Sequence, residues 1–184
     1  VKTVTHEEVT AEELGGAVTH NTKSGVADLA FENDIEALML TRRFINFLPY
    51  SNRERAPIWP SEDPATRVDP SLDSLVPDDP AKPYDIKELI VKIADEYDFF
   101  EVQPDYAPNI VIGFIRVEGQ SVGVIANQPM VLAGCLDINS AIKGGCFVSF
   151  CDALHTRILT FVVAPGCLPR TAAAVGGIYQ HGAH

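Results

Sequence analysis

Two glycine-bearing loops carry the clearest chemical signal in this sequence, because glycine lets backbone N–H groups approach a ligand closely. The loops span residues 127–134 and 164–170, and each follows an apolar, β-branched segment. Backbone N–H groups beside a helix N-terminus bind oxyanions and phosphates. One interpretation is therefore an oxyanion or phosphate cradle. The other is that Gly134 and Gly166 only permit tight turns.

The remaining reactive side chains form weaker patterns. Cys151 and His155 are one helical turn apart, as a thiol and its base could be, but Cys151 falls on the predicted core face, so a structural role is favoured. The histidines lack metal-ligand spacing. No paired-carboxylate or nucleophilic-serine motif is present, which argues against a hydrolase. One acidic cluster is interpreted as a solvated helix end and strand start: Asp95, Glu96, Asp98 and Glu101.

Composition narrows the class of protein. The 25 acidic and 14 basic residues give a net charge of -11, which argues against nucleic-acid binding. No apolar run approaches the roughly 18 residues of a membrane span, and no signal segment opens the sequence. Four cysteines without a C-x-x-C pair are interpreted as reduced, buried cytosolic thiols, and we expect no metal: Cys135, Cys146, Cys151 and Cys167.

A β-hairpin over residues 109–136 should organise the fold and position the first loop. Two apolar runs, residues 110–117 and 122–126, flank Glu118-Gly119-Gln120, whose glycine supplies the positive φ of a short turn. Both runs are apolar at nearly every position, so the hairpin is predicted to be covered on both faces.

Capping signals predict helices that begin near Thr10, Asn33, Asp85 and Asp137. The first should end at Gly15-Gly16, before a loop over residues 20–25. The third, with a capping box from Asp85 to Glu88, should reach about residue 96. Apolar faces are expected on the second and fourth helices, respectively: Leu38, Thr41, Phe44, Ile45 and Leu48, and Phe147, Val148, Cys151 and Leu154.

Strands are predicted at residues 99–102 and 157–163, in addition to the hairpin. A helix connects the second hairpin strand to the last strand, so these two strands should be parallel and joined by a right-handed crossover. Parallel strands end at the same edge of a sheet, and we therefore expect the two glycine-bearing loops to lie close together.

A proline-rich segment divides the sequence. Eight of the 13 prolines fall within residues 49–83, where apolar periodicity disappears. Such a segment is semi-rigid and should follow the surface between two packed bodies. The first residue, Val1, and the last residues suggest a piece of a longer protein.

Long segments of the sequence resemble the carboxyltransferase β subunits of propionyl-CoA carboxylase and related enzymes. They cover nearly the whole chain and include VKTVTHEEVTAEELGGAVTH, KSGVADLAFENDIEAL, SLDSLVPDDPAKPYDIKELI, FFEVQPDYAPNIVIGFIRVEGQSVGVIANQPMVLAGCLDIN and PGCLP followed by GGIYQHGA. The resemblance implies an α/β fold with crotonase-like domains of ββα units. Residues 1–48 would end the N-terminal domain, 49–83 would be the linker, and 84–184 would begin the C-terminal domain.

The resemblance also implies a function. The enzyme would transfer a carboxyl group from carboxybiotin, carried on a partner α subunit, to propionyl-CoA, giving methylmalonyl-CoA. Transcarboxylase and methylmalonyl-CoA decarboxylase subunits are the neighbouring alternatives. A homo-oligomer, a hexamer in the family, is implied, located in the bacterial cytoplasm or the mitochondrial matrix. The 184-residue chain alone is expected to be inactive.

On this resemblance, two sets of residues are candidates for the site. Pro165 and Gly166 would form the oxyanion or biotin-side loop. The biotin-side or substrate contacts would come from the remaining candidates: Asn127, Gln128, Ala133, Gly134 and Leu168.

The sequence departs from the family pattern near its end. His155-Thr156-Arg157 stands where an Asn-Ile-Pro stretch is usual, and further departures are Val163, Cys167, Arg170 and Ala173-Ala174-Val175. An arginine in place of glycine at position 170 could block the biotin-side pocket. A diverged, non-catalytic chain that serves only in assembly is therefore a competing hypothesis.

Overall fold

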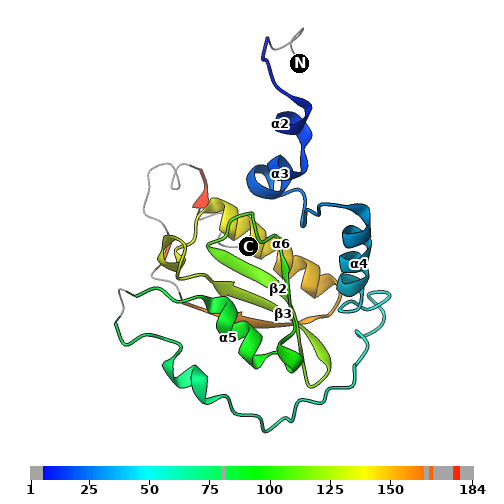
Figure 1. Cartoon of the computed structure of the whole chain (residues 1–184), viewed down its shortest axis with the longest axis vertical. Helices are drawn as coiled ribbons and strands as arrows, with labels where there is room; N and C mark the ends of the chain where they lie inside the picture. Colours follow the sequence, from blue (N-terminus) through cyan, green and yellow to red (C-terminus); the bar gives the residue numbers. More distant parts are fainter. Residues whose placement is uncertain (1–5, 80–81, 164–165, 168–175, 179–184) are drawn as a thin grey trace.

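The computed structural model describes residues 6–79, 82–163, 166–167 and 176–178. Its centre is a four-stranded sheet in the order β1-β2-β3-β4. Helix α5 covers one face of the sheet, and α6 and α4 cover the other (Figure 1). No helix in the described ranges is long and apolar enough to cross a membrane.

The sheet follows the predicted topology. Strands β1 (Phe99–Val102), β2 (Ile110–Val117) and β3 (Gln120–Asn127) are antiparallel neighbours, and β4 (Arg157–Phe161) is parallel to β3. Val117 pairs with Gln120, so the turn is Glu118-Gly119, with φ values of 51° and 74°. Two positive φ angles match the right-handed twist of a two-residue hairpin.

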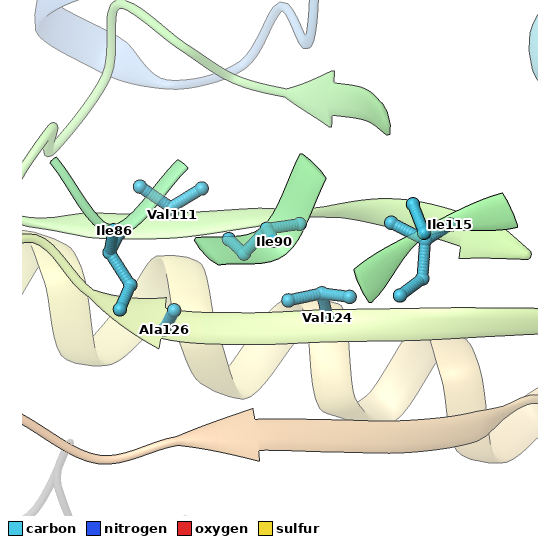
Figure 2. Packing of buried hydrophobic residues seen from close by; sticks show 7 residues of the cluster. Ile86, Ile90, Val111, Ile115, Val124 and Ala126 are labelled. Carbon is cyan, nitrogen blue, oxygen red and sulfur yellow. The ribbon is translucent and has the colours of Figure 1, made fainter. Parts of the chain in front are cut away.

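Helix α5 (Ile86–Ile93) forms the first hydrophobic layer. Ile86 and Ile90 point towards Val111 and Ile115 of β2 and towards β3 (Figure 2). The helix ends at Ile93, earlier than the predicted residue 96. The predicted capping box is wrong, because the Asp85 carboxylate accepts from the Lys87 N–H at 2.9 Å.

The opposite face of the sheet carries an aromatic core. Phe114 of β2 lies edge-on to Phe147 of α6 (Ile138–Ala153), with ring centroids 5.3 Å apart. Phe44 of α4 (Asp34–Ile45) stacks on Phe100 of β1 at 5.6 Å. Both faces of the hairpin are therefore covered, as predicted.

The predicted apolar face of α4 is only partly correct. Phe44 and Leu48 pack on the aromatic core, but Leu38 is 66% exposed and Ile45 is 50% exposed. Leu40, which the periodicity left out, joins the packed side. The helix leaves an apolar strip open to solvent because the sheet contacts only one edge of it.

Two short helices precede α4 and lie away from the sheet (Figure 1). Thr10 caps α2 (Ala11–Gly15) with the predicted capping box to Glu13, and α3 (Ala17–Thr19) follows. The loop predicted over residues 20–25 is wrong, because His20–Ser24 forms a π-helical turn. Gly25, with φ 63°, ends it.

The interpretation of the acidic cluster as solvated is wrong for Asp95, which is buried, whereas Glu96 is exposed as expected. The buried Asp95 carboxylate accepts from the N–H groups of Glu118 and Gly119, at 3.1 and 2.7 Å. The other three members also bind distant segments: Glu96 accepts from Ser61 and Glu62, Asp98 pairs with Arg43 and Arg116, and Glu101 pairs with Lys87.

The proline-rich segment follows the sheet surface and contains one 3₁₀ turn, Pro70–Ser74. The segment is attached to the hairpin, where the Trp59 N–H donates to the Gly119 carbonyl at 3.0 Å, and to the end of α5, where Arg67 donates to the carbonyls of Lys92 and Ala94. The Arg116 guanidinium lies 5.1 Å from the Trp59 ring and 4.2 Å from the Phe47 ring. One cation therefore joins the segment, the residues after α4 and β2.

The cysteine interpretation is correct in one respect and wrong in another. All four thiols are free. Only Cys151 is buried, whereas Cys135 is partly exposed and Cys146 and Cys167 are exposed. Val148, placed on the apolar face of α6, is also exposed, at 37%.

Two glycine substitutions should have opposite effects on stability. A Cβ at Gly119 would lie 1.9 Å from the Trp59 carbonyl oxygen, at φ 74°, so Gly119→Ala should lower the free energy of unfolding by at least about 2 kcal/mol. Gly145, inside α6, has open space around its Cβ position, so Gly145→Ala should raise it by about 0.5–1 kcal/mol. Chemical denaturation of the intact protein measures both. A Gly119→Ala variant as stable as the parent would contradict the proposed attachment.

Candidate functional site

The two glycine-bearing loops lie close together at the positions that the structure describes. Leu136 and Cys167 form a parallel β-bridge, and the Leu136 N–H donates to the Gly166 carbonyl at 3.2 Å. The convergence predicted from the crossover is confirmed for these positions. Pro165 and Leu168 lie outside the described residues, as do Arg170 and residues 173–175.

Asn127 joins the two loops. Its side-chain N–H donates to the Gly134 carbonyl at 3.0 Å, and its Oδ1 accepts from the Val163 N–H at 3.3 Å. The residue is 8% exposed. The amide therefore fixes the ends of β3 and β4 relative to each other, which sets the geometry of anything bound above them.

Gln128 connects the first loop to α5. Its Nε2 donates to the Asp85 carboxylate at 2.7 Å, and its Oε1 accepts from the Ile86 N–H at 3.3 Å. Both groups of a buried amide are thus used, as burial requires. Direct ligand contact by Asn127 and Gln128 stays a prediction, and their observed contacts are internal.

A strained turn follows Gln128. Leu132, Ala133 and Gly134 have φ values of 51°, 51° and 76°, in the left-handed region that costs a non-glycine residue about 1–2 kcal/mol. A Cβ on Gly134 would lie 2.4 Å from the Val163 carbonyl oxygen. Within the described part of the chain, the N–H groups of Leu132 and Ala133 donate to no acceptor. Sequence analysis identified Ala133 and Gly134 but missed Leu132, because nothing in a leucine signals positive φ.

The N-terminus of α6 is already occupied by its own carboxylate. Asp137 forms a capping box with Ser140 and also accepts from the Asn109 side chain at 3.2 Å. Burial opposes ionisation of Asp137, but the hydrogen bonds from Ser140 and Asn109 outweigh it and lower the pKa. The Asp137 carboxylate therefore places negative charge at the N-terminus of α6, which disfavours an anionic ligand there.

A cavity of about 630 Å³ lies beside this turn. Its walls come from the end of the proline-rich segment, the 129–133 loop and the end of β4. The lining includes both apolar and charged side chains: Val76, Asp78, Lys82, Tyr84, Met130 and Val163. Ala133 also lines it, so the strained turn faces a space large enough for a small ligand.

Lys143 is a buried charged side chain that sequence analysis missed. This lysine of α6 is 2% exposed and donates to the carbonyls of Gln103, Tyr106 and Ile110 at 2.8, 2.7 and 2.9 Å. It thereby holds the segment that leads into β2. The sequence did contain a signal for this burial. Lys143 lies on the same helical face as Phe147 and Cys151, which was predicted to face the core.

Cys151 and His155 do not form a catalytic pair. Cys151 is fully buried, and burial raises the pKa of its thiol to about 11. His155 is exposed and follows the helix at φ 54°. The structural role predicted for Cys151 is confirmed.

Comparison with known proteins shows the family to which this chain belongs. The carboxyl transferase domain family matches residues 1–184, so the chain belongs to that family. The fold is the mixed α/β, crotonase-like fold of carboxyltransferases, as predicted.

Individual relatives are similar over the whole chain. The propionyl-CoA carboxylase beta chain of Cereibacter sphaeroides is 63% identical over 183 residues, which are 100% of this chain and 36% of that protein. The methylmalonyl-CoA decarboxylase subunit alpha of Veillonella parvula is 51% identical, again over 100% of this chain and 36% of that protein. The chain therefore spans about a third of the length of these curated relatives.

A solved structure is similar in three dimensions. The transcarboxylase 12S hexamer core, crystallised with methylmalonyl-coenzyme A and methylmalonic acid bound, superposes with a TM-score of 0.95 at 42% identity. The match covers 99% of this chain and 35% of that one.

The buried lysine predicts a pH-dependent stability. Burial lowers the pKa of Lys143 to about 8, from an ordinary value of 10.5. Between these values the unfolded chain binds more protons than the folded chain, so the contribution of Lys143 to stability rises with pH, by roughly 2–4 kcal/mol in total. Lys143→Met should be less stable than the parent, by roughly 3 kcal/mol near pH 7, because carbonyls lose their donor. The difference in the free energy of unfolding between the parent and Lys143→Met should increase as the pH rises from 8 to 10.5.

Chemical denaturation at several pH values measures this gap. Cys151, whose raised pKa acts in the opposite direction above pH 9, is present in both proteins and cancels in the difference. Lys23→Met, at an exposed position, is the control and should leave the pH dependence unchanged. A gap that stays constant across the window would contradict burial of a charged lysine.

Proposed function

We propose that the protein carrying this chain transfers a carboxyl group from carboxybiotin to propionyl-CoA, giving methylmalonyl-CoA. The observation that carries this proposal is 63% identity, over the whole chain, to a relative named propionyl-CoA carboxylase beta chain. The strained turn at Leu132 to Gly134 and the adjoining cavity support this proposal. Backbone N–H donors beside a space large enough for a ligand can stabilise an enolate or carboxylate oxygen.

The chain would supply one part of the active site. The N–H groups of Leu132 and Ala133, with Gly166, would donate to oxygens that gain negative charge during transfer. Asn127 and Gln128 would position this turn through their internal hydrogen bonds. Pro165 and Leu168 would extend the biotin-side wall.

The cavity residues fit a biotin ring system in character. Val76, Met130 and Val163 provide apolar walls, and Ala133 of the strained turn also lines the cavity. Biotin, carried on a partner subunit, would bring the activated carboxyl group. The chain itself would orient the acceptor carbon, exclude water and stabilise the enolate oxygen.

The domain organisation follows from the same proposal. Residues 1–48 would end an N-terminal carboxyltransferase domain, 49–83 would link the domains, and 84–184 would begin the second. The exposed strip on α4, including Leu38, would be covered by the remainder of the first domain or by another subunit of a homo-oligomer. We expect the chain alone to be inactive, and the whole protein to be located in the bacterial cytoplasm or the mitochondrial matrix.

Decarboxylation or carboxyl exchange is the second candidate function. The relative named methylmalonyl-CoA decarboxylase subunit alpha is 51% identical over the same residues, which supports a related chemistry run in the opposite direction. Both candidates use the same acyl-CoA pair, so they differ in partner subunits rather than in this chain.

An assay of the full-length protein tests the proposal. With free biotin and methylmalonyl-CoA we expect propionyl-CoA to form, and with a carboxylated biotin partner and propionyl-CoA we expect methylmalonyl-CoA. Product is measured by chromatography. Failure in both directions with every short acyl-CoA would overturn the function.

Gly134→Ala should reduce kcat at least about tenfold, because the added Cβ collides with the Val163 carbonyl and displaces the donor turn. Gly145→Ala, the matched control in α6, should retain the parent rate. Equal rates for both variants, with intact folds by circular dichroism, would show that the turn takes no part in catalysis.

A further inference from the structure

A second cavity lies at the opposite end of β3 from the candidate site. It has a volume of about 360 Å³ and is lined by three segments: Arg55 to Ile58, the start of β3, and the residues after α6. Strand β3 runs for eight residues from Gln120 to Asn127, so the two sites are separated by roughly 25 Å. The carboxyl-transfer proposal uses none of these residues.

The lining is basic. Arg55, His155 and Arg157 all contribute to it, and none of the described lining residues is a carboxylate. This contrasts with the net charge of -11 of the whole chain. Arg157 is held in place because its Nη1 donates to the Gln120 Oε1 at 2.8 Å, which leaves its other N–H groups available.

Two of the lining residues, Ser121 and Thr156, carry buried hydroxyls without a partner. Ser121 is 8% exposed, and its Oγ has no hydrogen-bond partner among the described residues. The buried Oγ1 of Thr156 likewise has none there. Buried polar atoms without partners are rare, and a serine hydroxyl changes direction by one χ1 rotation. Donors of this kind beside cations suit an oxyanion.

The backbone carbonyls at the end of α6 already accept hydrogen bonds from the chain itself, so they do not compete with a bound anion for the donors of the cavity. Those of Phe150, Cys151 and Asp152 accept from the N–H groups of Leu154, Thr156 and His155. The Asp152 side chain is exposed and does not line the cavity. The partial negative charge of the helix end stabilises the Arg157 guanidinium.

We propose that this cavity binds phosphate as the inorganic ion or as a small phosphomonoester. Two guanidinium groups can donate to several oxygens of one tetrahedral anion, and the hydroxyls of Ser121 and Thr156 add further donors. The volume lies in the range of small-molecule sites and exceeds what one phosphate fills, so a phosphomonoester with a short organic group fits.

Calorimetric titration of the intact protein tests this site, with inorganic phosphate and glycerol 3-phosphate as probes at constant ionic strength. We expect saturable binding of at least one probe. Arg157→Gln and Arg55→Gln should each weaken it at least about tenfold, as loss of a charge-assisted contact predicts. Arg53→Gln removes the same charge two residues from Arg55, outside the lining, and should leave affinity unchanged.

Ser121→Ala separates binding from folding. Removal of an unpartnered hydroxyl should leave the thermal melting temperature unchanged or higher, while the affinity for the probe falls at least about threefold. Carboxyl transfer assayed in parallel should be unaffected, so failure of this site and failure of the proposed function are distinguishable. No saturable binding, or equal weakening by Arg53→Gln and Arg157→Gln, would overturn the proposal.

Discussion

The hydrogen bonds of two adjacent buried amides determine how the candidate site is assembled. Asn127 fixes the end of β3 to the end of β4, and Gln128 fixes the same strand end to the start of α5. A single strand end thus positions a loop, a neighbouring strand and a helix. The strained turn at Leu132 to Gly134 depends on this arrangement, since left-handed conformations persist only where surrounding contacts determine them.

Two buried charged side chains, Asp95 and Lys143, connect distant segments of the chain. Asp95 holds the hairpin turn, whose Gly119 carbonyl in turn holds Trp59 of the proline-rich segment. Lys143 holds the segment before β2 through backbone carbonyls. Each interaction satisfies backbone groups that cannot pair within a strand or helix, which explains why the ions are buried.

Local signals predicted the strands, the hairpin turn and the helix starts well. Thr10 and Asp137 cap as expected, since capping depends on residues three positions apart. Long-range contacts were missed: Asp95 was interpreted as solvated and Lys143 was overlooked, because their partners lie 23 to 40 residues away along the chain. The left-handed Leu132 could not be predicted either, since its conformation is imposed by tertiary contacts.

The exposed strip of α4 is an apolar surface that the described residues leave uncovered. Ile35, Leu38 and Met39 are each about two-thirds exposed or more, although the same helix packs Phe44 firmly into the aromatic core. Apolar surface of this kind on a well-formed helix is stabilised by covering it. Since Arg43 of α4 pairs with Asp98 and donates to the Phe99 carbonyl of β1, any body that covers the strip would be coupled mechanically to the sheet. A body packed on the α4 strip would then be connected to the candidate site through the contacts of α4 with the sheet.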